Sequence, residues 1–303
     1  MTSPAPAPLG AIAHYNLLEP LEPAGPGELY RARDTRLGRT VAVRVLPASF
    51  VPDPASRAAL IARARTVSSL SHPNVIALFE VGEDGGRVYF VFEFLSGQSL
   101  RAQMAGRPMN VRRAVEVAIQ IADAIADAHA AGFVHGGLSP DSVIVTARGH
   151  AKVPAFELAA RAGFEAGGGD ARLRDYDSPE EARGQTPDER SDVYSIGAIL
   201  YEMLTTRRPS HRGASAPSAS NPHVPQALDA AVLKAVAPNP EARYQNVVTL
   251  AAELRGVLAS FESRTAAETP PRGHGASAGR VIALALAMLA AIAFVLWWFV
   301  GVG

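Results

Sequence analysis

The residues of this chain that could do chemistry gather in one short segment, His135–Ser142. It reads His-Gly-Gly-Leu-Ser-Pro-Asp-Ser and so contains an imidazole, two hydroxyls and one carboxylate, Asp141. At three of its positions, Gly137, Ser139 and Ser142, there is no group that ionises near neutral pH or binds magnesium through a charge. His135 is interpreted as a packing residue, so the segment offers little acid–base or metal chemistry beyond the Asp141 carboxylate.

Two other patterns that can indicate chemistry lack the context they need. Gly275–Gly279 fits the Gly-x-Ser-x-Gly pattern of hydrolases, but it lies in a polar linker and not at a strand–turn–helix corner. The eight histidines form no His-Glu-x-x-His pattern, and the chain has no cysteine. The sequence thus favours neither a hydrolase nor a zinc site, and disulfides are excluded.

A long series of motifs surrounds the first segment. Together they span about residues 13 to 262 and comprise Leu29–Asp34, Val41–Leu46, Leu70–Val75, Val88–Phe94, Ser178–Glu180, Asp188–Gly197 and Asn239–Tyr244. In type and order these motifs resemble the bacterial eukaryotic-like, or Hanks-type, serine/threonine protein kinase family. The resemblance implies an α+β, bilobal protein-kinase-like fold, with a β-rich small lobe at 13–97 and a mostly helical large lobe at 98–262.

The 135–142 segment resembles the catalytic loop of that family, which usually reads His-Arg-Asp-Leu-Lys-Pro-x-Asn. In the family the Asp accepts the substrate's proton, the Lys steadies the phosphoryl group and the Asn holds magnesium. Gly137, Ser139 and Ser142 occupy those positions here, and Ala155 replaces the magnesium-binding Asp of the Asp-Phe-Gly motif. We therefore expect no catalytic residue and no metal site at these positions.

The family's nucleotide site is also altered. Its glycine-rich loop corresponds to Glu22–Gly27, where Gly25 and Gly27 stand among two prolines that cannot donate a backbone N–H to phosphate. Arg44 replaces the strand lysine and Arg63 replaces the helix glutamate, so two like charges stand in place of the usual ion pair. These substitutions predict a degenerate ATP site. No cofactor is expected and magnesium is disfavoured, although weak ATP binding stays open.

Three local alternatives stay open. Arg44 could stabilise the small lobe or act as a residual contact for an anion. Glu157, which replaces the glycine of the Asp-Phe-Gly motif, could reach Arg44 or Arg63 and fill the vacated space. Asp141 or Asp175 could stand in for a lost carboxylate and so restore catalysis.

Three polar residues occupy positions that hold the family fold together. In the family, an aspartate at the position of Asp192 binds the catalytic-loop backbone. A Glu–Arg pair at the positions of Glu180 and Arg243 ties the activation segment to a late helix. These roles need no catalysis. A retained frame combined with lost catalytic groups predicts a pseudokinase.

The predicted function is that of a membrane-anchored binding, scaffold or regulatory module in bacterial serine/threonine phosphosignalling, without phosphoryl transfer. Its partner would be a protein, either an active kinase or a membrane signalling protein. The alternatives are an active serine/threonine kinase with compensating residues, and a decayed gene. The 29 basic and 29 acidic residues balance, which disfavours nucleic acid as a partner.

A second strong signal lies near the C-terminus. Residues 281–300 form an apolar run without any charge, long enough as a helix to cross a hydrocarbon core of about 30 Å. Trp297 and Trp298 lie near one end, and Arg272 and Arg280 precede the other. The pattern predicts a single-pass helix in the bacterial inner (cytoplasmic) membrane, with the kinase-like domain in the cytoplasm. A linker at 263–280 and a short outer tail at 301–303 would flank the helix.

Composition and spacing predict three further segments. Residues 1–12 are rich in Pro and Ala and are expected to be a disordered tail, and residues 209–225 are expected to be a mobile loop. Apolar residues at helical spacing predict an amphipathic helix over 112–131. Its Asp123 and Asp127, four residues apart, are interpreted as part of a solvated face and not as a carboxylate pair.

Overall fold

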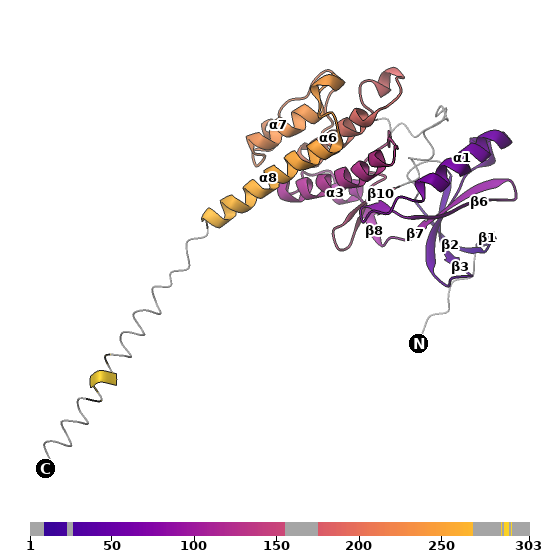
Figure 1. Cartoon of the computed structure of the whole chain (residues 1–303), viewed down its shortest axis with the longest axis horizontal. Helices are drawn as coiled ribbons and strands as arrows, with labels where there is room; N and C mark the ends of the chain where they lie inside the picture. Colours follow the sequence, from indigo (N-terminus) through magenta and orange to yellow (C-terminus); the bar gives the residue numbers. More distant parts are fainter. Residues whose placement is uncertain are drawn as a thin grey trace, which may run out of the picture. The chain divides into compact units, whose positions relative to one another are not determined.

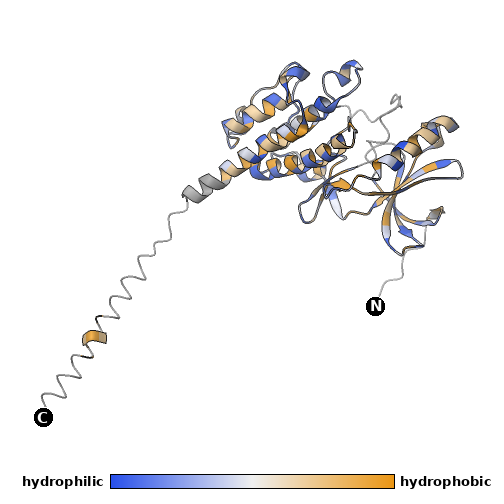
Figure 2. Ribbon diagram, viewed as in Figure 1, coloured by the Kyte–Doolittle hydropathy of each residue, from blue (hydrophilic) through white to orange (hydrophobic). Residues whose placement is uncertain are grey.

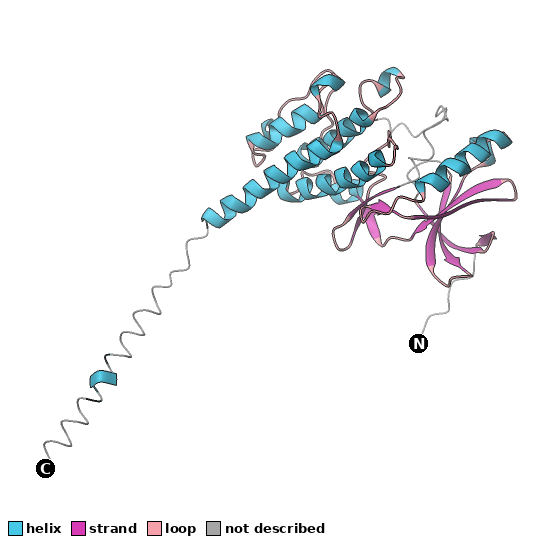
Figure 3. Cartoon of the chain, in the orientation of Figure 1, coloured by secondary structure: helices cyan, strands magenta, loops and turns pink. Residues whose placement is uncertain are grey.

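The computed structural model describes residues 9–22, 27–154 and 175–268, together with the isolated helical residues 286, 288–290 and 292. The chain divides into two compact units, Met1–Ala259 and Ser260–Gly303. Within the first unit, a β-rich lobe is followed along the chain by a mainly helical lobe (Figure 1, Figure 3). The bilobal architecture implied by the sequence resemblance is thereby confirmed.

The small lobe is built on a six-stranded antiparallel sheet in the order β1-β2-β3-β4-β7-β6. Its strands are β1 Gly10–Ile12, β2 Tyr15–Leu21, β3 Glu28–Asp34, β4 Thr40–Val45, β6 Leu78–Asp84 and β7 Arg87–Glu93. Alternation along β4 buries Val41 and Val43 in the core of this lobe. Tyr15 and Tyr89 lie in the same core, and each donates a hydroxyl hydrogen bond of 2.8 Å to the carboxylate of Glu80.

One helix, α1 (Pro54–Val67), packs on this sheet and contacts β6. Its start is set by Asp53, whose carboxylate accepts the N–H of Ser56 at 2.8 Å, and by Pro54, which occupies a position where no N–H is needed. The 3-10 turn η1 (Ala48–Phe50) precedes it. The buried side chains of α1 are Leu60, Ala64 and Val67.

A second sheet, ordered β5-β10-β9-β8, combines strands from both lobes. Its strands are β5 Val75–Ile76, β8 Gly97–Ser99, β9 Ile144–Thr146 and β10 Ala151–Pro154. Strand β10 pairs parallel with β5 and antiparallel with β9, and β9 follows the 135–142 loop along the chain. The sheet therefore fixes the exit of that loop relative to the small lobe.

The large lobe is built around helix α6. Its helices are α2 Leu100–Met104, α3 Val111–Ala130, α6 Glu189–Thr205, α7 Gln226–Ala235 and α8 Val247–Glu268, with 3-10 turns η2 Glu181–Arg183, η3 Pro217–Ala219 and η4 Pro240–Ala242. Helix α6 is buried along most of its length and contacts both α3 and α7. Gly197 permits the close approach of α7, because a Cβ atom there would lie 2.7 Å from the Cβ of Ala235.

The amphipathic helix predicted over 112–131 is confirmed as α3, along which hydrophobic and hydrophilic residues alternate (Figure 2). Its Asp123, interpreted as part of a solvated face, is 32% exposed and accepts bonds of 2.5 and 2.7 Å from Arg255 of α8. Sequence spacing within one helix could not reveal this partner, because Arg255 lies far along the chain.

Two segments expected to lack structure are ordered in part. Residues 10–12, placed in the predicted tail, form β1 and pair with β2, because the side chain of Ile12 is fully buried. Residues 209–225, predicted as a mobile loop, instead contain η3 and hydrogen bonds to residues of α6 and α7. Asn221 donates to the Leu204 carbonyl at 2.9 Å, and the N–H of Ser218 donates to the Asp229 carboxylate at 2.9 Å.

Most of the apolar run at 281–300 lies outside the described residues. The described part is helical, and Leu286, Met288, Leu289 and Ile292 are exposed. Across the portion of the chain that is described, no helix combines the length and apolar character needed to cross a bilayer.

Candidate functional site

The 135–142 loop is held by one buried carboxylate, that of Asp192 on α6. Asp192 accepts the backbone N–H groups of His135 at 2.8 Å and Gly136 at 2.7 Å, and lies 2.7 Å from Nε2 of His129. The Asp192 side chain is fully buried. Since a buried carboxylate is costly unless its oxygens are bonded, these contacts fix the loop against α6 and α3.

Within the loop, the side chains of Ser139 and Ser142 are turned toward each other. Ser139 is 0% and Ser142 4% exposed. The Ser142 hydroxyl donates to the Ser139 carbonyl at 3.0 Å and receives the Ser139 N–H at 3.4 Å. Both hydroxyls thus serve the turn itself. Gly137, also buried, supplies no functional group.

Asp141 is the carboxylate of the loop, and it is held by Arg101 of α2. The Arg101 guanidinium lies 3.3 Å from Asp141 and 2.6 Å from Glu202 of α6, and it also bonds the hydroxyl of Tyr176. Tyr176 in turn donates to Glu202, and burial, reinforced by Glu202, raises the pKa of Tyr176. We call these four residues the Arg101 cluster. The cluster ties the loop, α2, α6 and the chain before Ser178 together.

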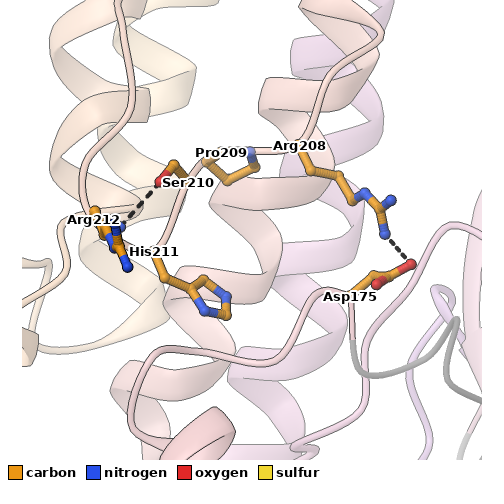
Figure 4. Close-up of a pocket in the computed structure, with 6 residues that line it drawn as sticks. All are labelled: Asp175, Arg208, Pro209, Ser210, His211 and Arg212. Carbon is orange, nitrogen blue, oxygen red and sulfur yellow. Dashed lines mark hydrogen bonds and ion pairs between the residues drawn. The ribbon is translucent and has the colours of Figure 1, made fainter.

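Asp175, the other carboxylate considered as a substitute, forms an ion pair with Arg208 (Figure 4). Arg208 follows the end of α6, so this contact holds residue 175 against the large lobe. Asp141 and Asp175 therefore both face guanidinium groups, and each is engaged in an ion pair within the large lobe.

Glu180 and Arg243 form a buried, two-pronged ion pair. The two terminal guanidinium nitrogens of Arg243 each lie 2.7 Å from an oxygen of Glu180. Glu180 is 7% exposed and Arg243 is 2% exposed. Burial opposes ionisation of Glu180, but the hydrogen bonds from Arg243 outweigh it and hold the pKa of Glu180 at about 2. The Ser191 hydroxyl adds a bond of 2.9 Å to Glu180. The pair joins the segment before η2 to the segment that follows η4.

The residues at the nucleotide-site positions are distributed over the small lobe. Arg44 lies on β4 opposite Leu29 and Phe90 and is 6% exposed. Arg63 lies on α1 and stacks over the Phe133 ring, with its guanidinium carbon 5.5 Å from the ring centroid, and burial lowers its pKa.

Gly27 is required by its backbone position. Its φ is +87°, and a Cβ atom there would lie 2.4 Å from the Val45 carbonyl oxygen. Gly25, Ala155 and Glu157 lie outside the described residues, so the proposed contact of Glu157 with Arg44 or Arg63 stays a prediction.

One contact between the two sheets was not predicted from the sequence. The Lys152 ammonium on β10 lies 2.5 Å from the Glu93 carboxylate at the end of β7, and the same carboxylate oxygen accepts the Ala77 N–H at 3.0 Å. Lys152 is one of only two lysines among many arginines. A lysine in a chain that otherwise uses arginine indicates a position that needs a compact ammonium group. Such a group suits contact with a single oxygen, whereas the forked guanidinium of arginine suits paired contacts.

Both the sequence and the fold of this chain are similar to those of known protein kinases. A model of the protein kinase domain matches residues 23–254. Serine/threonine-protein kinase PknB of Mycobacterium tuberculosis is 36% identical over 281 residues, covering 84% of this chain and 44% of the relative. PrkC of Bacillus subtilis is 31% identical over 258 residues, covering 80% and 40%. The chain thus spans less than half the length of these relatives.

A crystal structure shows the same fold at lower identity. The PknI kinase domain of Mycobacterium tuberculosis superposes with a TM-score of 0.67 at 20% identity, covering 82% of this chain and 97% of that domain. This likeness concerns the fold alone. The matched domain model and the relatives above 30% identity show that the chain belongs to the bacterial Hanks-type serine/threonine protein kinase family.

Proposed function

We propose that this chain is a pseudokinase that acts by binding other signalling proteins and does not transfer phosphate. The observation that carries the proposal is the internal bonding of the 135–142 loop. The loop keeps its shape through Asp192, while the hydroxyls of Ser139 and Ser142 bond the loop itself and Gly137 offers no base. Phosphoryl transfer needs a group to position the nucleophile and charges to stabilise the phosphoryl oxygens.

The two carboxylates that could compensate are engaged elsewhere. Asp141 belongs to the Arg101 cluster, and Asp175 is paired with Arg208. Moving either one to a substrate hydroxyl would break its ion pair with Arg101 or Arg208. These contacts support the interpretation that catalysis has not been rescued by a neighbouring acid.

The nucleotide site supports weak binding at most. Arg44 and Arg63 stand where the family uses a lysine and a glutamate, and Arg63 packs on Phe133. Two cations cannot form the pair that holds an active site together, although one of them could still contact an anion. We therefore propose no cofactor requirement and no magnesium site, with metal-free ATP binding as the remaining possibility.

We further propose that residues 281–300 anchor the protein in the inner membrane, with the kinase-like domain in the cytoplasm. The apolar run is long enough, and its described residues Leu286, Met288, Leu289 and Ile292 are helical and 54–71% exposed. Anchoring would confine the domain to the membrane plane and raise its effective concentration toward membrane partners. An active kinase or a membrane signalling protein would then be bound through a weak interface.

A radiometric phosphoryl-transfer assay on the full chain tests the proposal. We expect no transfer to protein or peptide substrates in Mg-ATP, and no transfer after Asp141→Asn or Asp175→Asn. Transfer that disappears in either variant would show compensated catalysis and defeat the proposal. A thermal-shift measurement with ATP, with and without magnesium, is expected to show little stabilisation and no added effect of the metal.

A further inference from the structure

A cationic pocket lies in the large lobe, where the segment after α6 meets the chain before Ser178 (Figure 4). It is an open cavity of about 520 Å³. We call it the cationic pocket, and its lining residues are Asp175, Arg208, Pro209, Ser210, His211 and Arg212. None of them belongs to the 135–142 loop or to the nucleotide-site positions.

The lining carries more positive than negative charge. Arg208, Arg212 and the imidazole of His211 are exposed, and Asp175 is the acid that lines the same cavity. Asp175 is paired with Arg208, so the pocket already holds one carboxylate against one guanidinium. Such a pair can be exchanged, since a ligand with a greater negative charge can take the place of Asp175 at Arg208.

Short contacts hold the wall of the pocket in place. The N–H of Arg212 donates to the Ser210 hydroxyl at 3.1 Å, and Nε2 of His211 lies 3.0 Å from the Asp177 carbonyl oxygen. The His211 ring also meets the ring of Tyr194 edge-on, with centroids 5.8 Å apart. Because a carbonyl oxygen only accepts hydrogen bonds, Nε2 of His211 is the donor in its contact with Asp177.

We propose that the cationic pocket binds a phosphorylated serine or threonine within a segment of a partner protein. Guanidinium groups suit phosphate because their N–H groups form paired bonds with its oxygens. The cavity is large enough for a phosphorylated side chain together with flanking residues, and its open mouth admits an extended segment. The inference rests on the proposed function, because it supplies the recognition through which an inactive domain would select phosphorylated signalling proteins.

Fluorescence polarisation with the full chain tests the inference. The probe is a labelled degenerate peptide library with one fixed phosphothreonine, compared with the same library carrying threonine. We expect the phosphorylated library to bind on the order of tenfold more tightly, and Arg208→Gln to remove most of that difference. Asp175→Asn should strengthen binding several-fold, because the competing carboxylate is removed.

Arg112→Gln is the matched control. Arg112 is 48% exposed and paired with Glu116, whereas Arg208 is 47% exposed and paired with Asp175. We expect the control to bind like the parent chain. Stronger binding by Asp175→Asn is a gain that a misfolded variant cannot imitate, so the test holds even if Arg208→Gln folds poorly.

Three results would overturn the inference: equal binding of the two libraries, no effect of Arg208→Gln, or weaker binding by Asp175→Asn. Phosphatidylglycerol vesicles form a second arm. Vesicle binding that requires Arg208, without phosphopeptide binding, would also overturn it. Absence of peptide binding alongside absence of phosphoryl transfer defeats only this inference. Measured transfer would instead defeat the proposed function, whatever the peptides do.

Discussion

Replacing Arg243 with glutamine tests how the large lobe is held together. Arg243→Gln removes a guanidinium that is 2% exposed and forms both 2.7 Å bonds to Glu180. It also removes bonds to the carbonyls of Ala237 at 2.7 Å and Arg190 at 3.0 Å. The Glu180 carboxylate, 7% exposed, would then lose its cationic partner and keep neutral donors such as the Ser191 hydroxyl at 2.9 Å.

The expected loss is large because one buried charge is left without its partner. Breaking a buried ion pair in this way costs about 3–5 kcal/mol. In a domain of this size that lowers Tm by roughly 6–20 °C. The control is Arg190→Gln, whose partners Asp188 and Glu241 are 51% and 73% exposed. Exposed pairs contribute about 0–1 kcal/mol, so the control should change Tm little.

Circular dichroism of the full chain is the suitable assay. Both tryptophans, Trp297 and Trp298, lie outside the kinase-like domain, so their fluorescence would not report its unfolding. If Arg243→Gln proved no less stable than Arg190→Gln, the ion pair would not stabilise the lobe and the reasoning would be refuted.

The same pair predicts a pH dependence. Burial opposes ionisation of Glu180, but the bonds from Arg243 hold its pKa at about 2, below the ordinary value of 4.5. A lowered folded-state pKa means that the stabilisation is fully present above about pH 4.5 and is lost as the pH falls toward 2. The difference in Tm between the parent chain and Arg243→Gln should therefore narrow below pH 4.5. A constant difference would contradict the assignment.

Three further substitutions test the frame around the 135–142 loop and the sheets. Asp192→Asn should lower the free energy of unfolding by about 1–3 kcal/mol, because the side-chain amide of asparagine accepts fewer hydrogen bonds than the carboxylate. Hydrogen exchange should become faster at the backbone N–H groups of His135 and Gly136, whose acceptor is this carboxylate. Unchanged exchange there would count against the role of Asp192. Gly27→Ala should lower stability by about 1–3 kcal/mol, because its Cβ would lie 2.4 Å from the Val45 carbonyl oxygen at a φ of +87°; an unchanged Tm would disprove this strain. Lys152→Met should lower the free energy of unfolding by about 1 kcal/mol, because it removes the cationic partner of Glu93. A urea unfolding midpoint equal to that of the parent chain would contradict a stabilising role for this contact.

Much of the fold could be predicted because its signals are local and ordered. Strands such as β4 and β7 coincide with apolar runs, and the apolar spacing over 112–131 marks α3. Side-chain roles were predictable only where a family motif fixes them. The contacts of Asp192 with the loop are of this kind, since a known motif tells where its partner lies.

The Arg101 cluster could not be predicted. Its members Arg101, Asp141, Tyr176 and Glu202 are separated by up to 101 positions, and no spacing rule joins them. The prediction of a mobile loop at residues 209–225 failed for a different reason. Their Ser, Pro and Gly content indicates a mobile loop, but composition does not reveal the hydrogen bonds of Asn221 to Leu204 and of Ser218 to Asp229.

The structure explains how a kinase-like loop can change its side chains without losing its shape. The oxygens of Asp192 bond the backbone N–H groups of His135 and Gly136, so these contacts do not depend on the side chains at Gly137, Ser139 or Ser142. Catalysis depends on those side chains, whereas folding depends on the backbone contacts and on pairs such as Glu180–Arg243. Selection for binding alone would therefore preserve the second set and release the first, because the second set holds the fold that presents any binding surface.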